Sequence, residues 1–220
     1  MEMGNKKVNI FNIVVPIVLL VATMIISLID YPSVFEKSKW TVITVFVAVI
    51  IYIIFWIYLK PDKFSRNGGI IIGSLFIINI SVEEFINWQT KSGSLVSTLT
   101  MMFLIFISFS FISAIKTIKT DSFTSGLKSS FVSAMLGTII ALCFGFMINF
   151  LFPDRMVFVL KGYPGYTDFS NPRAFTFFNA FDNASNHVII APIISILMGS
   201  VGGWIALTIF TNEKKKIKKA

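Results

Sequence analysis

Two apolar segments decide the fold of this chain: SAMLGTIIALCFG at residues 133–145 and APIISILMGSVGG at residues 191–203. Each predicts a helix with a small residue at every fourth position. Residues four apart lie on one helix face, so each row forms a shallow groove in which another backbone can approach closely. We expect the two helices to pack together through these rows, which are Ser133, Gly137, Ala141 and Gly145 in the first and Ala191, Ser195, Gly199 and Gly203 in the second.

The composition of the whole chain indicates that its solvent is a lipid bilayer. Of the 220 residues, 55% are hydrophobic and only 14% are charged, and the mean hydropathy is +0.80. A soluble domain of this length carries a larger share of charged residues. The expected fold class is therefore all-α, a polytopic integral membrane bundle that forms a single transmembrane domain.

Six stretches are long enough to cross about 30 Å of hydrocarbon at about 1.5 Å per residue. The third is expected to begin after Gly68-Gly69, a pair typical of a helix break, and the fifth to stop at Pro153. The predicted spans are residues 8–29, 40–59, 70–88, 95–115, 127–152 and 187–210.

The distribution of basic residues predicts the orientation of the bundle. With the N-terminus inside, the inner segments hold thirteen of the nineteen lysines and arginines. This bias predicts that both termini are cytoplasmic and that the chain lies in the plasma membrane. The basic tail at residues 212–220 is expected to rest against anionic lipid, and the positive net charge is therefore not taken as a sign of nucleic-acid binding.

One connection is long, at residues 153–186, and lies outside on this topology. Gly162 and Pro164-Gly165 predict turns in its first half. Pro172 suits the first position of a helix, and Phe175, Phe178 and Phe181 follow at helical spacing. We expect a short helix here, either flat in the outer interface or folded over the bundle as a lid.

Polar residues continue both small-residue rows and recur on the third predicted span. Asn149 extends the first row, Asn179, Asn183 and His187 precede the second, and Asn79 and Glu83 are four residues apart. A charged residue inside a span is costly unless it is functional, although Glu83 and Glu84 can also lie at the interface if the span ends early. We expect an outward-facing polar vestibule lined by Asn79, Glu83, Asn149, Asn183 and His187.

These features favour a small transporter, or the membrane subunit of a transport or resistance assembly, that is not an enzyme. In this hypothesis the vestibule captures a cation or polar solute, and Glu83 or His187 changes protonation. A rival is a scaffold or sensory protein that binds partners, or a second copy of itself, through the Phe-rich outer segment or the small-residue faces. A weaker rival is an intramembrane enzyme that uses Glu83, Glu84 and His187. With one histidine and one cysteine, Cys143, no metal and no cofactor are expected.

Overall fold

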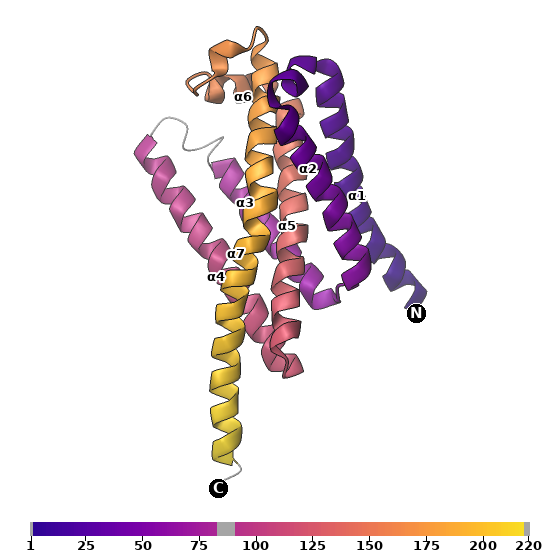
Figure 1. Cartoon of the computed structure of the whole chain (residues 1–220), viewed down its shortest axis with the longest axis vertical. Helices are drawn as coiled ribbons and strands as arrows, with labels where there is room; N and C mark the ends of the chain where they lie inside the picture. Colours follow the sequence, from indigo (N-terminus) through magenta and orange to yellow (C-terminus); the bar gives the residue numbers. More distant parts are fainter. Residues whose placement is uncertain (1, 83–90, 218–220) are drawn as a thin grey trace.

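The computed structural model of the chain describes residues 2–82 and 91–217, and its regular structure there is entirely helical, which confirms the all-α class. The helices form an upright bundle with a short helical cap at one end (Figure 1). They are α1 (Glu2–Asp30), α2 (Pro32–Leu59), α3 (Lys63–Ser81), α4 (Lys91–Thr120), α5 (Phe123–Leu151), α6 (Pro153–Leu160), the 3-10 turn η2 (Tyr166–Asp168) and α7 (Pro172–Ile217).

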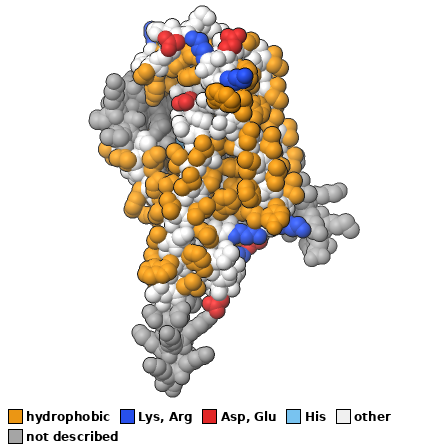
Figure 2. Space-filling view, viewed as in Figure 1, with side chains coloured by type: hydrophobic (Ala, Val, Ile, Leu, Met, Phe, Trp, Pro, Cys, Tyr) orange, Lys and Arg blue, Asp and Glu red, His pale blue; other side chains and the backbone are white. Residues whose placement is uncertain are grey.

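Several of these helices are long and apolar enough to cross a membrane. Four qualify among the described residues, namely α2, α5, Thr98–Thr120 of α4 and Pro172–Ile209 of α7, and the apolar part of α1, Val14–Asp30, is shorter. Figure 2 shows a broad band of hydrophobic side chains with charged groups gathered above and below it. Large hydrophobic side chains are exposed on several helices, for example Ile54, Phe103 and Ile189. The pattern indicates a membrane-embedded protein.

Helix α5 lies at the centre of the bundle. It contacts α1, α3, α4 and α7, and most of its side chains are buried. One hydrophobic core joins it to α1, α2 and α7, with Phe146 and Phe181 fully buried, and a second core joins it to α3, α4 and α7 around Phe109. A helix surrounded in this way needs small residues wherever a neighbour comes close.

The small-residue row of α5 packs against α3, not against the row of α7 as expected. A methyl group added at Gly137 would lie 2.5 Å from Ile72 of α3, and Ser133 donates a 2.8 Å hydrogen bond to the Ser65 carbonyl. Helix α3 has a matching row at Ser65, Gly69 and Gly73. Gly68 and Gly69 therefore do not break the helix, which begins at Lys63, and they lie in its tightest contact.

The small-residue row of α7 packs on a different face of α5. A methyl group at Gly199 would lie 2.9 Å from Ser130, and one at Gly203 would lie 3.0 Å from Phe123. The hydroxyl of Ser130 also donates to the Ser195 carbonyl. Helix α3 occupies the small-residue face of α5, and the groove of α7 therefore receives Ser130 and Phe123 from another face of α5.

The last helix is one continuous element where the sequence suggested two. Helix α7 runs for 46 residues from Pro172, so the Phe-rich segment is its first part, neither a separate interfacial helix nor a lid. Its polar residues do not end the helix because their side chains bond within it, as Ser185 does to Asp182. The predicted turn is present, with Gly165 at a φ of 82°, but α6 was not anticipated.

A tyrosine from α2 donates a hydrogen bond to a backbone carbonyl of α7 that the internal proline leaves without its helical donor. Pro192 has no N–H, so the carbonyl of Val188 lacks its helical donor. The hydroxyl of Tyr52, which is 5% exposed, donates to that carbonyl at 2.6 Å. In hydrocarbon no water can take this place, so the contact fixes α2 against α7.

We expect Tyr52→Phe to lower the free energy of unfolding by about 1–3 kcal/mol, the cost of a buried acceptor left without a donor. In a Pro192→Ala background residue 192 regains its N–H and pairs with Val188, so the same change should cost less than half as much. Unfolding of the four proteins in mixed micelles measures the coupling. Equal costs in both backgrounds would contradict this account.

Two glycines of α5 should respond in opposite ways to alanine. Gly137→Ala forces a methyl group onto Ile72 and should destabilise the protein, whereas Gly145 has no atom within 4 Å of the added methyl group. Gly145→Ala should be neutral or stabilise by up to about 1 kcal/mol through helix propensity. Thermal unfolding of both variants in one detergent is the measurement, and similar losses in both would exclude the proposed packing.

Candidate functional site

A polar cavity of about 160 Å³ lies among α3, α5, α6 and α7. Four of the five residues predicted for the vestibule line it: Asn79, Asn149, Asn183 and His187. They come from three helices and from positions far apart in the sequence. The fifth, Glu83, and its neighbour Glu84 lie outside the described residues.

The cavity exists because two matched small-residue rows end at different heights. In the row of α3, Gly73 meets Ile140 and the next position is the larger Ile77, and beyond Gly73 the side chains of Phe76 and Ile80 line the cavity. On α5 the row continues past this level through Ala141 to Gly145. At this level α3 carries large side chains and α5 carries the small residues Ala141 and Gly145, and the cavity lies between the two helices.

Asn149 is the most buried polar residue of the α5 wall, at 4% exposure. Its Nδ2 donates to the Gly145 carbonyl at 2.8 Å, which fixes the orientation of the amide. Its Oδ1 is buried and has no hydrogen-bond partner among the described residues. Such an acceptor is costly in a folded protein unless a ligand or water reaches it.

His187 lies on the exposed side of the same cavity. Its Nδ1 donates to the Asn183 carbonyl at 2.8 Å, since a carbonyl can only accept. The ring packs edge-on against Phe76 of α3, with 5.6 Å between centroids. The hypothesis that His187 or Glu83 changes protonation remains a prediction.

Two further polar residues of α7, Thr176 and Asn179, also line the cavity. Asn179 precedes Asn183 by four residues, so the sequence already placed it on this face. Thr176 is three residues earlier still, inside the Phe-rich segment, and the aromatic spacing concealed it. Had the Phe-rich segment been predicted as the start of the last span, Thr176 and Asn179 would both have been assigned to the vestibule.

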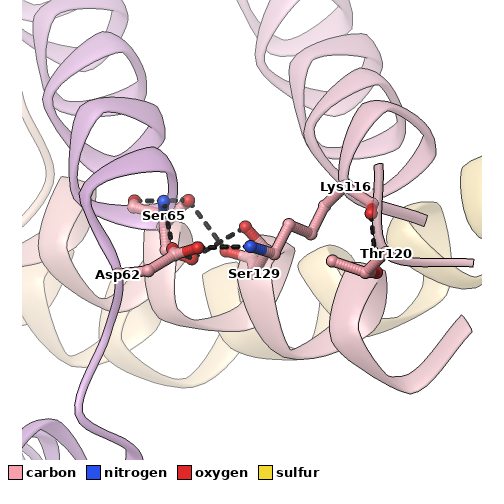
Figure 3. A network of polar contacts seen from close by, with 6 residues as sticks. Asp62, Ser65, Lys116, Thr120 and Ser129 are labelled. Carbon is pink, nitrogen blue, oxygen red and sulfur yellow. Dashed lines mark hydrogen bonds and ion pairs between the residues drawn. The ribbon is translucent and has the colours of Figure 1, made fainter. Parts of the chain in front are cut away.

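A second polar cluster joins α3, α4 and α5 at the opposite end of the bundle (Figure 3). Asp62 caps α3 by accepting from the backbone and hydroxyl of Ser65 at 2.9 and 2.6 Å, and it forms an ion pair with Lys116 of α4. The Ser65 hydroxyl also bonds to Ser129 of α5 at 2.8 Å. The cluster holds the three helices together at the end where α3 begins.

Partial burial raises the pKa of Asp62, but the contacts with Lys116 and Ser65 outweigh it and lower the pKa from 3.8 to about 2. A carboxylate with a lowered pKa stabilises the fold above its unfolded pKa, and this contribution is lost as the pH falls toward the folded value. The cluster is therefore a structural contact at neutral pH.

Replacing this carboxylate gives a pH-dependent test. Asp62→Asn keeps an N-cap acceptor but removes the charge, so it should lower the melting temperature at pH 7. The difference from the unaltered protein should shrink as the pH falls from about 4 to about 2. In a Lys116→Met background the substitution should have much less effect. A difference that does not vary with pH would show that the ion pair contributes nothing.

Comparison with known proteins leaves the cavity as the basis for any functional argument. No family model matches the chain, and no curated protein and no solved structure matches it. The cavity of about 160 Å³ has room for water or a small solute, and its polar lining consists of amides, an imidazole and a hydroxyl.

Proposed function

We propose that the chain is a small membrane transporter, or the membrane subunit of a transport or resistance assembly, that takes a small polar solute or cation into this cavity. The observation that carries the proposal is the meeting of Asn79, Asn149, Asn183 and His187 in one cavity within an apolar bundle. Of these four side chains Asn149 is buried, and buried polar side chains in membrane proteins are costly and mark solute or ion pathways.

We further propose that six helices cross the plasma membrane with both ends of the chain in the cytoplasm. Two arguments support this. Helix α1 begins and α7 ends at the end of the bundle opposite α6 (Figure 1), as an even number of spans requires. The inner segments also hold most of the lysines and arginines. In this orientation the cavity lies toward the outer side, near α6.

The wall chemistry suits a small solute better than a large partner. The volume of about 160 Å³ has room for several waters or one small organic molecule. Of the aromatic residues considered for partner binding, Phe175 and Phe181 are buried at 2% exposure or less, whereas Phe178 is partly exposed. Transport is therefore the function that the site supports best.

Filling the cavity should block passage of solute. Gly145 lines the cavity and has no atom within 4 Å of an added Cβ, so Gly145→Leu should project into the space without disturbing helix packing. Proteoliposomes would be mixed with concentrated glycerol, urea or propylammonium chloride, and their reswelling followed by light scattering. We expect faster entry of at least one solute than into empty vesicles, and a loss of most of this difference in Gly145→Leu.

The matched control is Gly145→Ala, which adds one carbon and should retain most of the rate. Both variants must show the melting temperature of the unaltered protein or a higher one. If none of the solutes enters faster than into empty vesicles, or if folded Gly145→Leu behaves like Gly145→Ala, the cavity is not a transport site.

A further inference from the structure

The polar cavity is elongated along α7, and its two ends differ. Thr176 and His187 line it eleven residues apart on one helix, which is about 16 Å along the axis. Ring contacts between Phe150 and Phe177, with centroids 4.8 Å apart, set the register of α5 against α7. Asn149 therefore lies near the level of Thr176, at the end of the cavity toward α6, and His187 lies at the other end.

Three polar groups of the wall, on Asn149, Thr176 and His187, each donate a hydrogen to a carbonyl of their own helix. A backbone carbonyl can only accept, so a side chain bonded to one acts as the donor. Two of these groups, at the end of the cavity toward α6, keep acceptors: Oδ1 of the Asn149 amide and the lone pairs of the Thr176 hydroxyl. The three bonds run from Asn149 to Gly145 at 2.8 Å, from Thr176 to Arg173 at 2.9 Å and from His187 to Asn183 at 2.8 Å.

These acceptors favour a ligand that brings several donors. A primary ammonium group has three donors and no acceptor, whereas an alcohol has a single donor. The described lining residues include no Lys or Arg that would repel a cation. They include no Asp or Glu either, so the ammonium group would be held by dipoles, not by an ion pair.

The remainder of the wall suits a short hydrocarbon chain. Phe76, Leu142, Phe146 and Met156 line the cavity between and around the polar positions. Small-molecule sites commonly combine an apolar wall with a few convergent polar groups that orient the ligand. An alkyl chain can lie along this wall, with its polar head at the end where the buried acceptor lies.

We propose that the cavity binds a small primary alkylammonium ion, with its ammonium group at Oδ1 of Asn149 and Oγ1 of Thr176 and its chain extended toward Phe76. The inference rests on the proposed function, because it names the class of solute for the same site. Asn149 carries the argument, since it is buried and its Oδ1 has no partner among the described residues.

The test is calorimetric titration of the purified chain in nanodiscs of neutral phosphatidylcholine at pH 7, with empty nanodiscs subtracted. The probes are propylammonium, its trimethylated analogue, which has no N–H, and 1-propanol, which is neutral. We expect saturable binding of propylammonium, and affinities at least about tenfold weaker for the other two probes, because the trimethylated head has no N–H to donate and the alcohol has one donor and no charge.

Two variants and one control locate the site. Asn149→Leu removes the acceptor that has no partner, so the protein should remain folded while propylammonium binding weakens about tenfold or more. Gly145→Leu fills the cavity and should abolish binding. Thr138→Val removes a buried hydroxyl of α5 that does not line the cavity, and it should leave the affinity unchanged.

Equal or tighter binding of 1-propanol or of the trimethylated probe would overturn the inference, as would an unchanged affinity in folded Asn149→Leu. If no amine binds but glycerol or urea still enters vesicles in a manner that depends on Gly145, the ammonium assignment fails and the proposed transport function stands. If no probe binds and filling the cavity changes no permeation, both fail.

Discussion

The close approach of α3 to α5 is the contact on which the rest of the bundle depends. It is possible because both helices lack bulk at the crossing, where Gly69 and Gly73 meet Leu136 and Ile140 and Gly137 meets Ile72. Between helices in hydrocarbon there is no hydrophobic driving force, so tight van der Waals packing must hold them together. The end of this packing also creates the cavity. The small residues of α3 and α5 thus contribute to the stability of the bundle and border the polar cavity.

Polar groups follow a second constraint, the lack of water to pair with them. Most hydroxyls on these helices donate to a carbonyl one turn earlier, as Ser27, Ser195 and Ser200 do. Others bond between helices, as Ser110 of α4 does to the Met198 carbonyl of α7. Asn149 departs from this pattern because its Oδ1 has no hydrogen-bond partner among the described residues. Its side chain lies at the wall of the polar cavity.

Much of this architecture follows from the sequence. Helical periodicity placed the small residues and the asparagines on common faces, and Asn79, Asn149, Asn183 and His187 do share one cavity. Which helix each row would face did not follow, because any small-residue face can accept any neighbour. The glycine pair of α3 was misinterpreted because a rule for helix breaks in water does not hold where glycine permits close packing. The length of α7 was missed because polar residues within it resembled a loop, although their side chains bond back to the helix.

The length of α7 has a mechanical consequence. It is a single rod from Pro172 to Ile217, about 69 Å at 1.5 Å per residue and more than twice the hydrocarbon thickness. The only internal proline of this rod, Pro192, lies just beyond His187, where the Val188 carbonyl bonds to α2 instead of to its own helix. From Pro192 the arm toward Ile217 is about 38 Å long, so a tilt of about 10° at that level would displace its end by roughly 7 Å. The wall of the cavity on α7 lies within about 24 Å of Pro192, between Thr176 and His187, so the same tilt would move it less than it moves the Ile217 end.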